Sequence, residues 1–179
     1  MVAWFDEMVL NWFQSIQNDI LTGIFRLITA LGEGGIIWII IALFFLLWKK
    51  TRVIGVTMLL ALLFSLLVGN LTLKPLVARP RPCWRNPEIP LLITNPTDYS
   101  FPSGHAMSSF AAAVGIYMWR RPAGLAALLG AVIMSATRMY FYVHYPTDIL
   151  AGMLIGIVLG VFAYLLMKRI KVRKPKVFD

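Results

Sequence analysis

Long apolar runs separated by short polar segments dominate the chain. A helix that crosses a bilayer needs about 20 mostly apolar residues. Runs that approach or reach this length are 34–48, 53–72, 102–119, 123–140 and 147–167. The first run is short and can borrow residues from before Gly32. The pattern predicts an all-α polytopic membrane helix bundle with about five transmembrane helices.

The N-terminal segment, residues 1–33, follows a different pattern. Its apolar residues recur at helical spacing with polar residues between them: Trp4, Phe5, Val9, Trp12, Phe13 and Ile16. This spacing is typical of an amphipathic helix in the membrane interface. Residues 19–31 extend that helix or dip into the bilayer, and glycines at 32, 34 and 35 mark a break. We expect one domain, with an interfacial or re-entrant helix at 1–33, a transmembrane core at 34–167 and a basic tail at 168–179.

Composition supports a membrane protein and excludes an ordinary soluble domain. Of the 179 residues, 59% are hydrophobic and 14% are charged, well outside the range of typical soluble domains. A formal net charge of +9 could indicate a nucleic-acid partner, but the cations stand at the ends of apolar runs, so we expect none. A single cysteine, Cys83, allows neither an intramolecular disulfide nor a cysteine-based zinc site.

The distribution of lysine and arginine predicts the topology. If the first span runs inward, the cytoplasmic side receives most of the cations: Lys49, Lys50, Arg52, Arg120, Arg121, Lys168, Arg169, Lys171, Arg173, Lys174 and Lys176. The positive-inside rule then places the C-terminus in the cytoplasm and loop 73–101 outside. The tail is expected to meet anionic headgroups of the inner leaflet.

Three polar segments meet on the predicted outer side. They are Lys74–Pro82, Phe101–His105 and Thr137–Asp148, and they contain both histidines of the chain. Ionised groups at the edge of the hydrocarbon region are costly and usually mark function. Singly, each residue has a simpler explanation, such as a helix cap or a snorkelling cation. Together, the three segments indicate a site.

The residue types in these segments suit a phosphate. Lys74, Arg81 and Arg138 supply three positive charges, and guanidinium groups match phosphate oxygens in pairs. A proline before Ser103 suits the first helical turn, so the backbone N–H groups of Ser103 and Gly104 are expected to point at an anion. Gly104 also permits a close approach because it lacks a Cβ atom. Arg79, two residues before Arg81, is not counted among these charges and is expected at the surface or against headgroups.

The two histidines suit separate chemical tasks. Asp148 lies four residues after His144, in the expected first turn of the last span, and can hold one ring nitrogen. The other nitrogen of His144 would then be free to attack phosphorus. His105 starts another helix and could protonate the leaving oxygen and later deprotonate water.

The three segments resemble the signature blocks of the type 2 phosphatidic acid phosphatase superfamily, which are integral-membrane lipid phosphatases. The blocks are Lys-x6-Arg-Pro at 74–82, Pro-Ser-Gly-His at 102–105 and a Ser-Arg-x5-His-x3-Asp pattern at 137–148. The resemblance implies a cofactor-free, metal-independent phosphatase with a phosphohistidine intermediate. His144 would be the nucleophile, Asp148 its orienter and His105 the general acid. The phosphoryl group would be bound by Lys74, Arg81, Ser103, Gly104 and Arg138.

The chain departs from the family pattern at two points. Thr137 stands where the family usually has serine, and its hydroxyl keeps the ability to hydrogen-bond phosphate. Family members often have six spans, whereas this chain is predicted to have five and an interfacial helix. Since the spans that carry the blocks are all present, we expect activity to be retained.

The expected reaction is hydrolysis of a phosphate monoester or pyrophosphate on a lipid whose tail stays in the bilayer. Candidate substrates are undecaprenyl pyrophosphate, phosphatidylglycerol phosphate and phosphatidic acid, in a bacterial inner membrane with the site facing outward. One alternative is a carrier or flippase that binds a lipid phosphate without cleaving it. Another is a metal site at His105, His144 and Asp148, which the three nearby cations disfavour.

Overall fold

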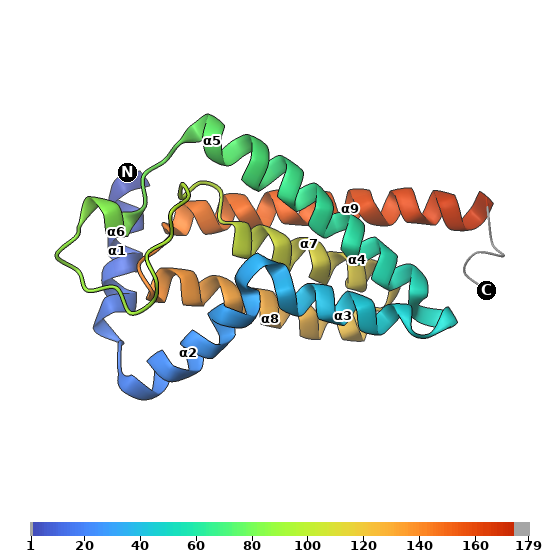
Figure 1. The fold of residues 1–179 in the computed structure, drawn as a ribbon, viewed down its shortest axis with the longest axis horizontal. Helices are drawn as coiled ribbons and strands as arrows, with labels where there is room; N and C mark the ends of the chain where they lie inside the picture. Colours follow the sequence, from blue (N-terminus) through green and yellow to red (C-terminus); the bar gives the residue numbers. More distant parts are fainter. Residues whose placement is uncertain (1, 174–179) are drawn as a thin grey trace.

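The structure, a computed structural model, describes residues 2–173, and this part of the chain is helical and contains no strand (Figure 1). The predicted all-α membrane bundle is confirmed. The α-helices are α1 (Val2–Ser15), α2 (Asp19–Gly32), α3 (Ile36–Leu46), α4 (Arg52–Ser65), α5 (Lys74–Val77), α6 (Pro82–Arg85), α7 (Gly104–Trp119), α8 (Arg121–Tyr140) and α9 (Pro146–Arg173).

Within residues 2–173, four helical stretches are long and apolar enough to cross a membrane. They are Asp19–Leu46, Lys49–Arg85, Arg121–Tyr140 and Pro146–Val172. The second is α4 continued through a π-helical stretch, Leu66–Leu73, into α5. α7 is shorter, with 16 residues, and packs against α4, α8 and α9. The number of spans therefore stays a prediction.

The break expected at the N-terminal glycines is present. Gly34 and Gly35 have φ angles of 58° and 74°, a left-handed conformation that glycine adopts without a Cβ clash. A short 3-10 turn here separates α2 from α3. The stretch that is long and apolar enough to cross a membrane nevertheless starts at Asp19, before this turn.

Glycines bring α9 directly against α7. A Cβ atom on Gly152 would lie 2.6 Å from the Ser103 carbonyl oxygen, and one on Gly160 would lie 2.6 Å from that of Ala111. A Cβ atom on Gly156, between them, would lie closer still to the Met107 carbonyl oxygen. Small residues at four-residue spacing are a common means of close helix packing in membranes. This packing sets the start of α7 beside the start of α9, where two of the predicted blocks lie.

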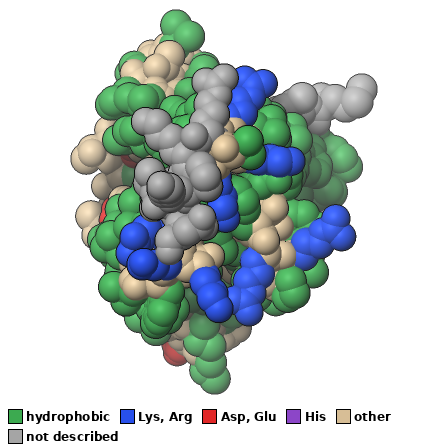
Figure 2. Space-filling view, turned by 90° about the vertical axis from the view of Figure 1, so that its right-hand side faces the viewer, with side chains coloured by type: hydrophobic (Ala, Val, Ile, Leu, Met, Phe, Trp, Pro, Cys, Tyr) green, Lys and Arg blue, Asp and Glu red, His purple; other side chains and the backbone are tan. Residues whose placement is uncertain are grey.

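The two ends of the bundle differ in character. α1 lies across one end, near loop 86–103 and the corner between α8 and α9, whereas α9 ends at the other (Figure 1). Leu10 and Phe13 of α1 pack against residues 140–143 of that corner, while Trp4 and Trp12 are exposed. Lysines and arginines gather at the opposite end (Figure 2). Of the predicted tail, residues 168–173 continue α9, and 174–179 lie outside the described residues.

Candidate active site

A cavity of about 1160 Å³ opens at the α1 end of the bundle, beside α2, α4 and α7. One part of its wall is polar and positively charged, and another is formed by apolar side chains of α3 and α4. The polar part includes Lys74, Arg81, Gly104, His105, Arg138 and His144, and the apolar part includes Ile39, Leu59, Leu62, Leu63 and Leu66. The cavity can therefore hold an anionic headgroup together with the start of an acyl or prenyl chain.

His144 lies in the corner between α8 and α9 and is 1% exposed. Its Nδ1 atom is 3.6 Å from Asp148 Oδ2, too far for a direct hydrogen bond. The Ser100 hydroxyl donates to Asp148 Oδ2 at 2.5 Å and lies 3.4 Å from His144 Nδ1. The structure thus brings the predicted pair together with a third residue, Ser100, between them. Sequence reasoning missed Ser100, which stands in an irregular loop.

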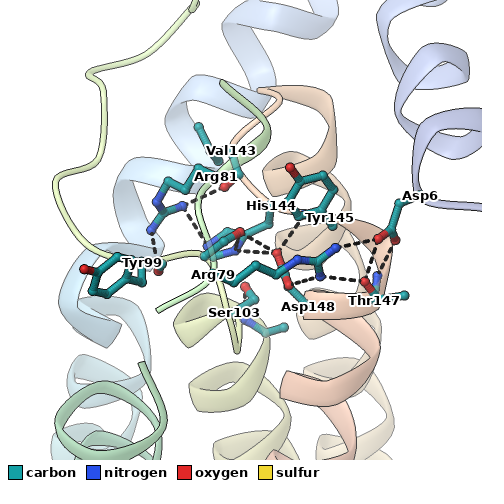
Figure 3. A network of polar contacts seen from close by, with 12 residues as sticks. Asp6, Arg79, Arg81, Tyr99, Ser103, Val143, His144, Tyr145, Thr147 and Asp148 are labelled. Atoms are coloured by element: carbon teal, nitrogen blue, oxygen red, sulfur yellow. Dashed lines mark hydrogen bonds and ion pairs between the residues drawn. The ribbon is translucent and has the colours of Figure 1, made fainter. Parts of the chain in front are cut away.

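The other ring nitrogen of His144 faces Arg81. Nη1 of Arg81 lies 3.1 Å from His144 Nε2 (Figure 3). Because a guanidinium group only donates, Nε2 is the acceptor and the ring proton is on Nδ1, toward Asp148. Burial, followed by the positive charges of Arg81 and Arg138, lowers the pKa of His144 well below its ordinary value. The imidazole is therefore neutral near pH 7, with its Nε2 lone pair toward the cations.

Two of the three predicted phosphate-binding cations are held by a carboxylate. Asp98 pairs with Lys74 and also accepts a 2.6 Å hydrogen bond from Arg81 Nη2. Burial alone would raise the pKa of Asp98, but its hydrogen bonds and charge interactions with Lys74 and Arg81 lower it to about 2. Sequence reasoning missed Asp98. The one signal for it is that it is an acidic residue in the loop between the first two blocks.

The third cation, Arg138, is 5% exposed and lies on the last turn of α8. Its Nη1 donates to the Thr29 hydroxyl of α2, and its buried Nε atom has no hydrogen-bond partner among the described residues. His105 Nε2 is a second buried atom of this kind. Both residues line the cavity. Buried polar groups normally have partners, so these two atoms indicate that the site is built to receive a polar guest.

The Pro-Ser-Gly-His block starts α7, as predicted, but its two amides differ. Ser103 caps the helix with its side chain, and its backbone N–H donates to the Asp148 carbonyl oxygen at 3.1 Å. The prediction that this N–H points at an anion is therefore wrong, because it joins α7 to α9. Gly104 lines the cavity, and its N–H belongs to the first turn, where amides have no helical partner. A Cβ at Gly104 would lie 3.0 Å from Asn70 Oδ1.

Known proteins with similar sequences place this chain in a family. The family model described as the PAP2 superfamily matches residues 54–171. The chain belongs to the PAP2 superfamily. This confirms the resemblance drawn from the three blocks, all of which lie within the matched region.

Individual PAP2 relatives carry several names. The chain is 35% identical over 127 residues to an undecaprenyl-diphosphatase of Sulfolobus acidocaldarius, covering 67% of this chain and 58% of that protein. It is 36% identical over 118 residues to a lipid A 4'-phosphatase of Bacteroides thetaiotaomicron, covering 61% and 52%. The chain thus matches little more than half the length of these relatives.

Two solved structures share the fold. LpxE of Aquifex aeolicus superposes with a TM-score of 0.72 at 23% identity, covering 88% of this chain and 93% of that chain. A transmembrane PAP2 type phosphatidylglycerolphosphate phosphatase from Bacillus subtilis gives a TM-score of 0.70 at 25% identity, covering 94% and 85%. The likeness to LpxE concerns the fold alone.

The departure of this PAP2 chain at Thr137 has a local explanation. The Thr137 hydroxyl donates to the Met134 carbonyl oxygen at 2.7 Å. Thr137 is fully buried and is not part of the cavity wall. In this arrangement the Thr137 hydroxyl, which could hydrogen-bond phosphate, is instead used within α8.

Arg79 also differs from its predicted place in the PAP2 site. Instead of meeting headgroups at the surface, its guanidinium donates to Asp148 Oδ1 at 2.5 Å and to Asp6 Oδ2 at 2.7 Å. It also lies 3.9 Å from the centre of the Tyr145 ring. The reason is that residues 78–81 turn inward across the start of α9, where two carboxylates need a cation.

The candidate ligands His144 and Asp148 of the alternative metal site are hydrogen-bonded to other groups of the chain. Within residues 2–173, no group of three or more His, Cys, Asp and Glu side chains is arranged to hold a metal ion. His105, His144 and Asp148 share a region, but Asp148 is enclosed by Arg79, Ser100 and the Tyr145 amide. Its oxygens are therefore committed to donors of the chain.

Proposed function

We propose that this protein is a membrane phosphatase that hydrolyses a lipid phosphate monoester or diphosphate through a phosphohistidine. The observation that carries the proposal is one cavity whose lining includes both imidazoles, the predicted phosphate-binding cations Lys74, Arg81 and Arg138, and an apolar wall. The cations match the charge of a phosphoryl group, and the apolar wall matches a lipid chain. The family and the names of the relatives support the same reaction class.

In the first step, the Nε2 lone pair of His144 forms a bond to phosphorus while the bond from phosphorus to the leaving oxygen breaks. His105 donates a proton to that oxygen. Asp148, acting through Ser100 and the Nδ1 proton, stabilises the positive ring that forms. The equatorial oxygens of the phosphoryl group are neutralised by Lys74, Arg81 and Arg138. The Arg81 N–H group that faces His144 Nε2 therefore turns to the phosphoryl group.

In the second step, water replaces His144. His105 takes a proton from the water as its oxygen bonds to phosphorus, and the bond between phosphorus and Nε2 breaks. Inorganic phosphate is released and both histidines return to their starting states. This route uses only groups of the chain, because the cations supply the charge stabilisation that a metal ion gives in other phosphatases.

The charge distribution supports an outward-facing site. Lysines and arginines gather at the end opposite the cavity (Figure 2). The segments between α3 and α4 and between α7 and α8, together with the last part of α9, contain Lys49, Lys50, Arg120, Arg121, Lys168 and Arg169. From the positive-inside rule we propose that this end faces the cytoplasm and that the cavity faces the extracytoplasmic side, in a bacterial inner membrane. The substrate class is then a lipid phosphate of the outer leaflet: undecaprenyl pyrophosphate, phosphatidylglycerol phosphate or phosphatidic acid.

The test is phosphate release by the purified protein in liposomes, with EDTA present and the three lipids assayed side by side. We expect turnover with at least one of them and none with His144→Ala.

A second experiment traps the intermediate with p-nitrophenyl phosphate, whose leaving oxygen needs no proton. His105→Asn should accumulate a base-stable, acid-labile phosphoprotein with this substrate, and His144→Ala should not. Turnover that persists in His144→Ala would overturn the nucleophile assignment.

A carrier or flippase for lipid phosphates remains the second candidate function, because the cations and apolar wall alone would serve it. It would have no use for His144 facing His105 across the same cavity. Binding of a labelled lipid phosphate with no phosphate release in any arm would select the carrier. Turnover that depends on His144 would exclude it as the principal activity.

A further inference from the structure

Asp6, on the N-terminal helix, is joined through Arg79 to Asp148, the carboxylate that faces His144. We infer that Asp6 and Arg79 are positioning residues for Asp148, so that α1 completes the active site. The inference rests on the proposed phosphatase function and adds two residues to it. Asp6 lies outside the region matched by the PAP2 family, and Arg79 is not one of the block residues named above.

The first link joins α1 to α9. Asp6 is 1% exposed although it stands on a surface helix. Its Oδ1 accepts the Thr147 backbone N–H at 3.0 Å, and its Oδ2 accepts the Thr147 hydroxyl at 2.8 Å. Asp6 therefore caps the N-terminus of α9 from the other end of the chain, where a negative charge is stabilised. This contact fixes α1 against the helix that carries Asp148.

The second link is the Arg79 guanidinium, which lies between Asp6 and Asp148 (Figure 3). Nη2 donates to Asp6 Oδ2 at 2.7 Å, and Nη1 donates to Asp148 Oδ1 at 2.5 Å and to the Thr147 hydroxyl at 2.8 Å. A planar fork reaches all three groups at once, which an ammonium group cannot do. The position of Arg79 therefore depends on Asp6.

The third link is the orientation of the Asp148 carboxylate, whose side chain is fully buried. With Oδ1 held by Arg79, Oδ2 accepts the Tyr145 backbone N–H at 2.9 Å and the Ser100 hydroxyl. Oδ2 is also the atom that faces His144 Nδ1. Arg79 thus decides which carboxylate oxygen serves the nucleophile. A substitution at Asp6 is therefore expected to change the orientation of the Asp148 carboxylate and the electrostatic potential at His144.

Substitutions of Asp6 and Arg79 are expected to shift the titration of His144 in opposite directions. Removing the negative charge of Asp6 destabilises the protonated imidazole of His144, whereas removing the positive charge of Arg79 stabilises it. The other charged and titratable groups around His144 stay in place in both variants: Lys74, Arg81, Asp98, His105, Arg138 and Asp148. The pH at which His144 titrates should therefore move down in Asp6→Asn and up in Arg79→Gln.

The experiment uses the full chain in lipid nanodiscs and measures two quantities. Turnover gives kcat, KM and the acid limb of the pH profile. The ¹⁵N shifts of labelled histidine, of which the chain has two, give the tautomer and titration of His144 without requiring activity. The variants are Asp6→Asn, Arg79→Gln and Arg79→Lys, and the matched control is Glu7→Gln, the same change on the exposed face of α1.

We expect Asp6→Asn to lower kcat by up to about 100-fold with KM little changed. The His144 titration should move by about half a pH unit or more, in opposite directions for Asp6→Asn and Arg79→Gln. Arg79→Lys keeps the charge and loses the fork, so kcat should fall while the titration stays close to that of the unmodified protein. Glu7→Gln should change neither quantity.

The inference is overturned if Asp6→Asn matches Glu7→Gln in both kcat and the His144 titration. It is also overturned if Asp6→Asn and Arg79→Gln shift the His144 titration in the same direction. The proposed function fails separately. If no lipid phosphate is hydrolysed by the unmodified protein while the opposite shifts are observed, the coupling from α1 to His144 stands without the phosphatase assignment.

Discussion

Asp98 Oδ1 accepts a 2.6 Å hydrogen bond from Nη2 of Arg81, a side chain that is itself 3.1 Å from the candidate nucleophile. The same carboxylate pairs with Lys74. An acidic side chain of the protein therefore holds the cations that are proposed to bind phosphate. A phosphoryl group that enters the site competes with Asp98 for both of them.

Replacing Asp98 with asparagine should strengthen the binding of phosphate-like anions. Loss of the carboxylate leaves Lys74 and Arg81 with more charge available, so the Ki of orthovanadate should fall by about 3- to 10-fold. Glu88→Gln removes an exposed carboxylate from the same loop and serves as the control. An unchanged or higher Ki in Asp98→Asn, with Glu88→Gln normal, would contradict this competition.

Protonation of Asp98 should play no part in the pH dependence between pH 5 and 8. Its pKa is lowered to about 2, so any stability from its ion pairs is present above the unfolded value of about 3.9. That stability is lost only as the pH falls through about 2. Removing the charge of Asp98 should still move the acid limb to lower pH, because Asp98 raises the pKa of His144, and an acid limb that stays in place in Asp98→Asn would contradict this interaction.

Removing the Ser100 hydroxyl should slow the chemical step. Ser100 is the group between Asp148 Oδ2 and His144 Nδ1, so Ser100→Ala should lower kcat by about 10- to 100-fold with little change in KM. Ser135→Ala removes an equally buried hydroxyl that bonds only the Ala131 carbonyl of its own helix. If the two variants lose activity equally, burial of a hydroxyl and not its place in the site would explain the effect.

The contact between α7 and α9 should tolerate no additional methyl group. Gly156→Ala would drive a Cβ into the Met107 carbonyl, which should cost about 1–3 kcal/mol of unfolding free energy and also lower activity. Gly130→Ala is the control, since its new Cβ would meet nothing nearer than Trp38 Cη2 at 4.0 Å. Unfolding in SDS, followed by fluorescence, measures both, and equal stability of the two variants would argue against the close packing.

The proposed topology can be tested with a membrane-impermeant maleimide on intact cells. In a Cys83→Ala background, Glu88→Cys lies at the cavity end and Val172→Cys lies near the end of α9. Val172 is not covered by other parts of the chain, and its labelling after lysis shows that the thiol can react. We expect labelling of Glu88→Cys in intact cells and of Val172→Cys only after lysis, and the reverse pattern would place the active site in the cytoplasm.

Much of the fold and part of the candidate site could be predicted from the apolar runs and the three blocks of polar residues. The runs predicted the bundle because a membrane-spanning helix must be continuously apolar, and the glycine break before α3 followed from local backbone preferences. Lys74, His105 and His144 were found because each belongs to a block of unusual residues beside a helix end. These features are local, so they can be read from neighbouring residues.

Residues that act through distant partners could not be found in this way. Asp6 and Arg79 are 73 residues apart, and Ser100 and Asp148 are 48 apart, with no periodicity that connects them. Ser103 was assigned a free amide because a helix start has unpaired N–H groups, and only the packing of α9 shows that one is used. The Thr137 hydroxyl has the chemistry to bond phosphate, and only the structure shows that it bonds the Met134 carbonyl within α8.

The amino-acid sequence alone determined the class of the molecule, the segments that carry its chemistry and the charge asymmetry of its ends, because these depend on residue type and short spacing. Tertiary structure decided which oxygen of Asp148 faces His144, which carboxylate holds the cations and how α1 joins the site. The physical reason is that hydrogen bonds and ion pairs require atoms within a few ångströms, and only the packing of α7, α8 and α9 brings those atoms together.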